Sequence, residues 1–193
     1  MTAEDGDTQV LKARKEDIQV KLTPKNTILH VAAQFGQAEC VKWILQLGSP
    51  SSLLRQPNEK GDTAIHLAAR ERHLTVVKNL IDAAKKLGEG NTERRAVADC
   101  TVMLRMINND KDTALHEAVR NHHPEVVKLL IQEDPHFTYG ANTEGNTPIF
   151  IAAEWGFGDL VQMILDNCSS PAHSGIKGRT ALHATVILED QDT

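Results

Sequence analysis

The chain has 193 residues, 40% of them hydrophobic, which is enough apolar content for a buried core. Its 26 acidic and 21 basic residues give a net charge of −5, the wrong sign for a surface that follows nucleic-acid phosphates. Aromatic residues make up only 4%, too few for a platform on which bases stack. Composition therefore argues against nucleic acid as a partner.

No stretch of the sequence approaches the roughly 18 consecutive apolar residues of a membrane-spanning helix. We therefore expect no membrane insertion by this chain itself. The acidic N-terminus lacks the apolar segment of a secretory signal. Three cysteines, Cys40, Cys100 and Cys168, form an odd set without metal-type spacing, which favours buried, reduced thiols. Together these features predict a cytoplasmic protein.

Residues 1–22 precede the patterned part of the chain. Within them, residues 8–18 place Val10, Leu11 and Ile18 among charged residues. We expect an N-terminal capping helix here, which would shield the first unit of the array that follows over residues 23–193.

A four-residue motif of the form Thr-x-Leu/Ile-His returns through the rest of the chain. Its five copies are Thr27-Ile28-Leu29-His30, Thr63-Ala64-Ile65-His66, Thr113-Ala114-Leu115-His116, Thr147-Pro148-Ile149-Phe150 and Thr180-Ala181-Leu182-His183. Successive threonines are 36, 50, 34 and 33 residues apart. Recurrence at such a period predicts an array of similar supersecondary units.

Each motif predicts the start of a helix. A threonine side chain caps the free N–H groups of a first turn, and Pro148 suits an early helical position. Apolar residues then recur at three and four positions in a second segment, which predicts amphipathic helices at 38–45, 74–81, 124–131 and 159–165. One helix pair cannot bury its apolar stripe alone, so neighbouring pairs must stack.

The motif and its period of about 33 residues resemble the ankyrin repeat. The resemblance implies an all-α solenoid of stacked helix-turn-helix units with short β-hairpin or turn fingers, and a role as a non-catalytic protein-protein interaction scaffold. We place the repeats near residues 23–57, 58–107, 108–141 and 142–174. A fifth, at 175–193, is expected to be truncated, because its second helix and a polar terminal cap are missing.

The 50-residue interval leaves an insertion in the second repeat, at about residues 85–101. The segment is polar, charged and glycine-bearing, which predicts an extension of the preceding helix followed by an exposed loop. A solvated loop is the favoured interpretation, and a loop that binds a partner is the alternative.

Four segments carry a closer resemblance, at residues 26–36, 111–120, 137–142 and 178–184. Together they resemble the plant ankyrin-repeat membrane proteins of the accelerated-cell-death type, over residues 22–187. The resemblance implies a cytoplasmic ankyrin array that precedes C-terminal membrane helices in a longer parent protein, and a role in defence and stress signal transduction. This chain would then be a soluble fragment, a short natural product or a shortened gene model.

Candidate catalytic and metal sites fail on spacing. His116-Glu117 begins like a zinc-protease helix, but Arg120 stands where the second ligand is needed. His122 and His123 would diverge by about 100° on a helix. We expect the motif histidines to tie turns to backbone groups within their own repeats. No catalytic residue, cofactor or metal ion is predicted; the alternative is an accessory or regulatory subunit of an enzyme, or an enzyme with a site in the array.

The register of the repeats and the resemblance predict two groups of protein-binding residues. The finger tips would present Glu59, Lys60, Asp62, Asn109, Asp110, Asp112, Thr143, Glu144 and Asn146. The ends of the first helices would face a concave groove with Phe35, Arg70, Glu71, Arg120, Asn121, Glu154 and Trp155. Trp155 is the expected interface anchor, and the alternative is that it packs against its own hairpin or Phe157. For the polar residues the alternative is an ordinary solvated surface.

Overall fold

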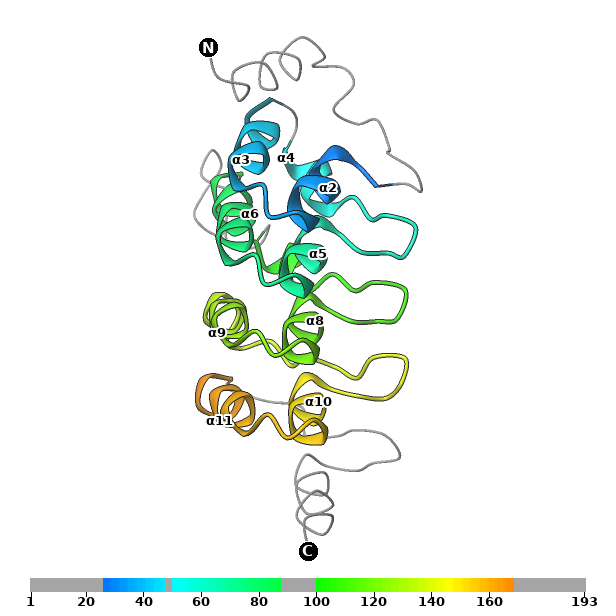
Figure 1. Cartoon of the computed structure of the whole chain (residues 1–193), viewed down its shortest axis with the longest axis vertical. Helices are drawn as coiled ribbons and strands as arrows, with labels where there is room; N and C mark the ends of the chain where they lie inside the picture. Colours follow the sequence, from blue (N-terminus) through cyan, green and yellow to red (C-terminus); the bar gives the residue numbers. More distant parts are fainter. Residues whose placement is uncertain (1–25, 48–49, 88–99, 169–193) are drawn as a thin grey trace, which may run out of the picture.

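A computed structural model describes residues 26–47, 50–87 and 100–168. Helices in these ranges form two columns of an elongated stack, and turns project from one side (Figure 1). The inner column consists of α2 (Ile28–Gln34), α5 (Ala64–Arg70), α8 (Ala114–Arg120) and α10 (Pro148–Glu154). The outer column consists of α3 (Ala38–Leu47), α6 (Leu74–Lys86), α9 (Pro124–Glu133) and α11 (Gly158–Asn167).

The threonines of the motif begin the four inner helices, as predicted. Each has an extended backbone immediately before the first helical residue; the four are Thr27, Thr63, Thr113 and Thr147. The Thr147 hydroxyl accepts a hydrogen bond from the backbone N–H of Phe150 at 3.4 Å. Pro148, which has no N–H to satisfy, occupies the first turn of α10.

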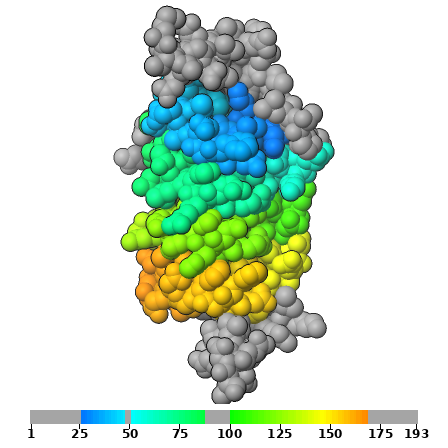
Figure 2. Space-filling model, viewed as in Figure 1, coloured from blue at the N-terminus to red at the C-terminus, as the bar shows by residue number. Residues whose placement is uncertain are grey.

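The core lies between the two columns as one continuous cluster. Inner helices contribute small residues, such as the fully buried Ala68 and Ala69 of α5. Outer helices contribute branched residues, such as Val77 and Leu80 of α6, which are also fully buried. Each fully buried aliphatic side chain of this size contributes about 1.5–3 kcal/mol through burial. Figure 2 shows the repeats packed as successive layers, from blue at α2 to orange at α11.

A sharp turn reverses the chain between the inner and outer helix of each repeat. The residue nine positions after the capping threonine has a positive φ in all four, at Gly36, Arg72, His122 and Gly156, with values of 68°, 63°, 51° and 70°. Glycine adopts this conformation without steric cost. A Cβ on Gly36 would also lie 2.6 Å from the ring Nδ1 of His73. Two repeats hold the same turn with a non-glycine residue.

The projecting turns that precede the inner helices are the fingers of the repeats, and they form turns rather than strands. Across the described ranges there is no extended strand, and Asn26 alone takes part in an isolated bridge. The all-α solenoid of stacked helix pairs is therefore confirmed, with the fingers in their turn form. None of the helices in these ranges is long and apolar enough to cross a bilayer.

A short helical segment precedes the fingers of the second and third repeats, and the sequence analysis did not predict it. It is α4 (Pro50–Arg55) in one case and residues 100–104 in the other. Each buries an apolar pair at the same offset from its motif, Leu53 with Leu54 and Met103 with Leu104. The predicted insertion at about residues 85–101 overlaps this helical segment at residues 100 and 101.

Several predictions fall on parts of the chain outside the described residues. These are the N-terminal capping helix, residues 88–99 of the insertion and the truncated fifth repeat. The repeat boundaries given above also remain predictions.

Candidate protein-binding groove

The motif histidines join neighbouring repeats. The ring Nδ1 of His30 accepts from the backbone N–H of Thr27 at 3.1 Å, and its Nε2 bonds the carbonyl of Asp62 at 2.9 Å. His66 repeats both contacts with Thr63 and Asp112, at 3.2 and 3.1 Å. The prediction that these histidines bond within their own repeats is correct for Nδ1. It is wrong for Nε2, which bonds the next repeat.

These contacts determine the proton position on each ring. A backbone N–H only donates and a carbonyl only accepts, so Nδ1 is bare and Nε2 carries the proton. Burial lowers the pKa of His30 and of His66, since the charged form would lose its hydration. The same cause lowers the pKa of His116 to about 4. The three rings are neutral structural links at neutral pH.

An asparagine organises each finger. Asn58, Asn108 and Asn142 stand five residues before the capping threonines of the second, third and fourth repeats. The Oδ1 of Asn108 accepts from the backbone N–H groups of Asp110 and Asp112 at 3.0 and 2.9 Å. Its Nδ2 donates to Oδ1 of Asp62 in the preceding repeat at 2.9 Å.

The other two finger asparagines make the equivalent bonds. Asn58 donates to Oδ1 of Asn26 at 3.0 Å, and Asn142 donates to Oδ1 of Asp112 at 2.8 Å. At the end of this series, the buried Oδ1 of Asn146 has no hydrogen-bond partner among the described residues. The asparagines therefore link each finger to the one before it.

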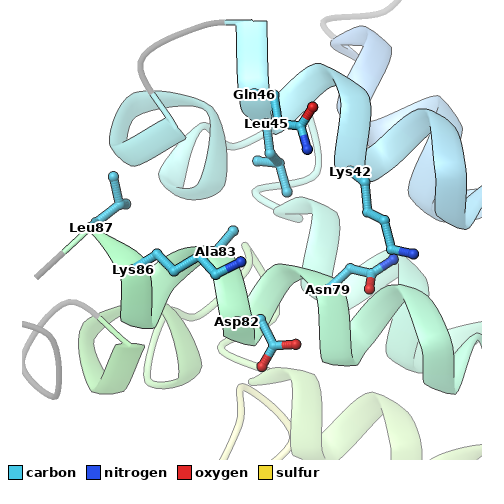
Figure 3. Close-up of a pocket in the computed structure, with 8 residues that line it drawn as sticks. All are labelled: Lys42, Leu45, Gln46, Asn79, Asp82, Ala83, Lys86 and Leu87. Atoms are coloured by element: carbon cyan, nitrogen blue, oxygen red, sulfur yellow. The ribbon is translucent and has the colours of Figure 1, made fainter. Parts of the chain in front are cut away.

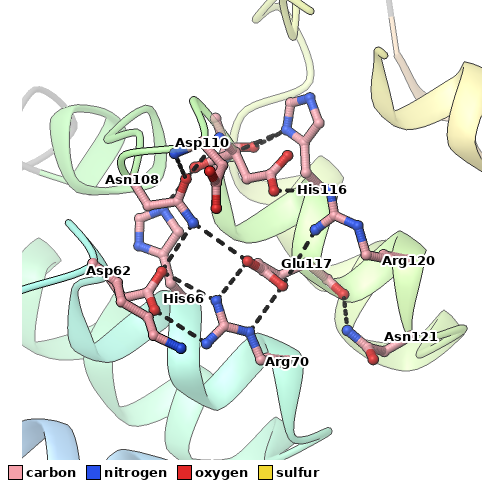
Figure 4. Close-up of polar contacts among 12 residues, drawn as sticks. Asp62, His66, Arg70, Asn108, Asp110, His116, Glu117, Arg120 and Asn121 are labelled. Carbon is pink, nitrogen blue, oxygen red and sulfur yellow. Dashed lines mark hydrogen bonds and ion pairs between the residues drawn. The ribbon is translucent and has the colours of Figure 1, made fainter. Parts of the chain in front are cut away.

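A network of ion pairs crosses the inner helices of the second and third repeats (Figure 4). Arg70 donates to both carboxylate oxygens of Asp62 at 3.1 Å, and to both oxygens of Glu117 at 3.0 and 2.6 Å. Arg120 pairs with Asp112 at 2.8 Å and with Glu117 at 3.5 Å. The three carboxylates are almost fully buried, whereas the side chains of Arg70 and Arg120 are 28% and 31% exposed.

The network favours the charged forms of Arg70 and Asp62. The carboxylate of Glu117 raises the pKa of Arg70 through hydrogen bonds, which outweigh the opposite effect of burial. Burial alone would raise the pKa of Asp62, but hydrogen bonds from Arg70 and Asn108 lower it by more, so the net shift is downward. Both groups are accordingly ionised at neutral pH.

Burial corrects three of the predicted finger-tip residues. Asp62, Asp112 and Asn146 are 0%, 3% and 5% exposed, so they lie beneath the fingers and not at their tips. Each stands directly before a capping threonine, where the asparagine and histidine contacts converge. Asp62 and Asp112 take part in the bonds that join neighbouring repeats.

The remaining polar residues of the predicted set lie where a partner has access. They are exposed at Glu59, Lys60, Glu71, Asn109, Asp110, Asn121, Thr143, Glu144 and Glu154. A hollow of about 330 Å³ opens between the fingers and inner helices of the second to fourth repeats. It is lined by Arg70, Asp110, Asp112, Glu117, Arg120, Asn142, Thr143 and Glu144. Members of both predicted groups therefore line one hollow, such as Asp110 and Glu144 from the finger tips and Arg120 from the end of an inner helix.

Two aromatic residues on the predicted list are strongly exposed. Phe35 and Trp155 occupy the same position, at the ends of α2 and α10, and are 66% and 61% exposed. The Trp155 ring also stacks on Phe157, with 6.4 Å between ring centroids and 24° between planes. The stacking sets the orientation of the indole and leaves most of its surface open to a partner.

His122 is a neighbour of this aromatic pair that the sequence analysis did not assign. Its ring stacks on Phe157 with 4.3 Å between centroids, and its Nε2 lies 3.0 Å from a carboxylate oxygen of Asp159. The sequence did contain a signal for this residue, because two other repeats carry glycine at the equivalent position, where φ is positive. Arg72 holds the equivalent position and faces Glu125 at 3.5 Å.

A second hollow, of about 380 Å³, lies on the opposite side between α3 and α6 (Figure 3). Its lining combines aliphatic groups with a few charges: Lys42, Leu45, Gln46, Asn79, Asp82, Ala83, Lys86 and Leu87. No predicted binding residue lines it.

Two of the three cysteines lie in the core. All three described thiols are free, and Cys100 and Cys168 are buried, as predicted, whereas Cys40 is only half-buried. Burial raises the pKa of Cys100 to about 11 and also raises the pKa of Cys168. Within the described ranges, no group of three or more histidine, cysteine or acidic side chains is arranged to hold a metal ion.

Comparison with known proteins agrees with this architecture. The family described as "Ankyrin repeats (3 copies)" matches residues 1–91, 83–174 and 115–193. Diacylglycerol kinase iota of Homo sapiens is 41% identical over 61 residues, which are 32% of this chain and 6% of that protein. The Rattus norvegicus protein is 37% identical over 67 residues, 35% of this chain and again 6% of the relative. With the family matched along its whole length, the chain belongs to the ankyrin repeat family.

Proposed function

We propose that this chain is a non-catalytic scaffold that binds another protein through its concave surface. The observation that carries the proposal is Trp155, whose ring stays 61% exposed at the end of an inner helix. An exposed tryptophan costs hydrophobic free energy when free, and tryptophan is among the commonest anchors of protein interfaces. The exposed finger residues around the hollow supply the polar rim of such an interface.

The rigidity of the surface supports the same function. Histidine and asparagine bonds hold each finger to its neighbour, so the exposed tips are presented in a fixed register. Preformed binding surfaces lose less conformational entropy when a partner docks.

Affinity capture with matched variants tests the proposal. The full chain and its Trp155→Ala variant would be used as baits in an extract of the source organism, and captured proteins would be identified by mass spectrometry. Leu165→Ala is the control, because Leu165 is also an exposed apolar residue, 44% exposed, but lies on the outer helix α11. A specific partner should be lost with Trp155→Ala and kept with Leu165→Ala. Loss with both variants, or with neither, would refute binding through the concave surface.

One observation favours a second candidate function, a regulatory or accessory part of an enzyme. The relatives reported above are named as diacylglycerol kinases, although they share only a short segment with this chain. Under this alternative the captured partner would be an enzyme, or part of the same polypeptide as one, and its turnover would change when the chain is added.

The finer proposal places the chain in plant defence or stress signalling, on the cytoplasmic side of a membrane. It rests on the resemblance of residues 26–36, 111–120, 137–142 and 178–184 to plant membrane proteins of the accelerated-cell-death type. Sequencing the complete transcript tests it directly. Membrane-helix codons downstream of Thr193 in the same reading frame would support it, and a stop codon there in every transcript would refute it.

A further inference from the structure

Charge is divided unevenly between the two sides of the stack. The fingers and inner helices, residues 26–35, 56–71, 106–121 and 140–155, form the inner face. They carry eight carboxylates and four lysines or arginines. The other described residues carry seven carboxylates and eight lysines or arginines. Among the described residues, the excess of negative charge therefore lies on the inner face, which is the side proposed to meet a partner.

The two arginines of the inner face are already paired. Arg70 and Arg120 are each paired with buried carboxylates of the ion-pair network. A guanidinium whose donors are used in this way has little left to offer an acidic ligand. Only Lys60 and Lys111, at the finger tips, are exposed cations on this face.

Most carboxylates of the inner face, in contrast, are exposed and lie outside the ion-pair network. Three of the eight satisfy the two arginines, and the five others are exposed, at Glu59, Glu71, Asp110, Glu144 and Glu154. Asp110 and Glu144 stand on consecutive fingers and line the same hollow of about 330 Å³. The hollow is lined by four carboxylates and two arginines, so its charge is negative. Because Arg70 and Arg120 are paired with carboxylates of the network, a lysine or arginine side chain entering the hollow would interact with Asp110 and Glu144 without displacing either arginine.

We propose that the inner face binds a lysine- and arginine-rich segment of its partner protein, and this rests on the proposed scaffold function. One cationic side chain enters the hollow between Asp110 and Glu144. Trp155 lies beyond the hollow, in the fourth repeat, and offers an aromatic face to apolar or cationic residues of the same segment. Complementary charge of this kind mainly accelerates association and excludes acidic competitors.

A selection experiment tests the chemistry without knowledge of the partner. A phage-displayed library of random 12-residue peptides would be selected against the full chain, and the best binders would be synthesised. We expect enriched peptides with net positive charge. The double variant Asp110→Asn/Glu144→Gln should weaken their binding about fivefold at low salt, because each exposed ion pair contributes modestly. The loss should shrink in concentrated salt as the charges are screened.

The matched control is the double variant Glu39→Gln/Asp166→Asn, which removes the same charge from exposed positions on the outer helices. Its affinity should stay within about twofold of the unmodified chain, because only the overall charge has changed. Basic peptides weakened equally by both double variants would be attracted by net charge alone, and the proposal would be wrong.

Two further outcomes distinguish this proposal from the scaffold function on which it rests. If the selected peptides are neutral or acidic and Trp155→Ala weakens them, the scaffold stands and the basic partner is refuted. If no selected peptide is weakened by any inner-face variant, both proposals are refuted.

Discussion

Arg70 and Glu117 join the second and third repeats through two hydrogen bonds of 3.0 and 2.6 Å. The same guanidinium also holds Asp62 of its own repeat. One side chain therefore neutralises two buried carboxylates that belong to different repeats. Asn108 of the third finger also donates to both carboxylates.

Removing that side chain should destabilise the whole stack. Arg70→Ala would leave Asp62 and Glu117 buried without their main counter-ion, and we expect a loss of about 2 kcal/mol or more in the free energy of unfolding. Chemical denaturation followed by circular dichroism measures it. The control is Arg72→Ala, whose ion pair with Glu125 is exposed and 3.5 Å long, and which should cost less than about 1 kcal/mol. Equal losses of unfolding free energy in the two variants would show that the buried network stabilises the fold no more than an exposed ion pair does.

Acid should weaken the histidine links. The pKa of His116 in the folded chain is about 4, below its ordinary value of 6.5. The unfolded chain therefore binds a proton first, and the stability contributed by this group, present above pH 6.5, is lost as pH falls toward 4. For His116 alone the loss amounts to about 3 kcal/mol. Denaturant titrations at several pH values between 7 and 4 would measure it.

The fourth repeat supplies the control for this pH dependence. Phe150 stands there where the other described repeats carry the motif histidine. His116→Phe keeps a ring in place and removes the titrating group, so stability should depend less steeply on pH between 6.5 and 4. An unchanged slope would mean that other groups cause the acid sensitivity.

The finger turn of the second repeat should reject a side chain. Gly61 has a φ of 79°, and a Cβ there would lie 2.7 Å from the backbone nitrogen of Asn109. We expect Gly61→Ala to lower the free energy of unfolding by about 1 kcal/mol or more. Gly140→Ala is the control, because its Cβ would meet nothing within 4 Å. The melting temperatures of both variants would test this prediction. An unchanged melting temperature in Gly61→Ala would show that the finger backbone adjusts to a side chain at little cost.

Trp155 should matter to binding more than to folding. For a partner that uses the concave surface, Trp155→Ala should cost about 2 kcal/mol of affinity, the scale of an interface anchor. Stability should change by less than about 1 kcal/mol, because the ring is mostly exposed and stacks on the partly buried Phe157. Affinity and unfolding midpoint are best measured on one sample. A destabilised variant that still binds tightly would remove Trp155 from the interface.

Much of the fold could be predicted because its causes are local. A threonine that caps a helix and a proline in the first turn act within a few residues, and the apolar period of an outer helix is visible in a single segment. The exposure of Trp155 also followed from its place at the end of an inner helix. These features need no knowledge of the neighbouring repeat.

The errors concern contacts between repeats. Asp62 looks like a turn residue in the sequence, but its partners Arg70 and Asn108 lie 8 and 46 residues away. The carbonyl that His30 bonds is 32 residues away. Burial of these groups depends on how the finger of one repeat lies across the helix of another, and the hydrophobic pattern does not report that. For the same reason, the helical segments before the second and third fingers were missed.

The asparagine bonds between fingers also affect how this surface could change over evolutionary time. Because the side chains of Asn108 and Asn142 bond the backbone of their own fingers and the preceding repeat, the framework does not depend on the side chains of the tip residues Asp110 and Thr143. Substitutions at the tips would therefore alter recognition while leaving the framework intact. A lineage carrying this array could acquire a new partner by replacing a few tip side chains, with each intermediate still folded.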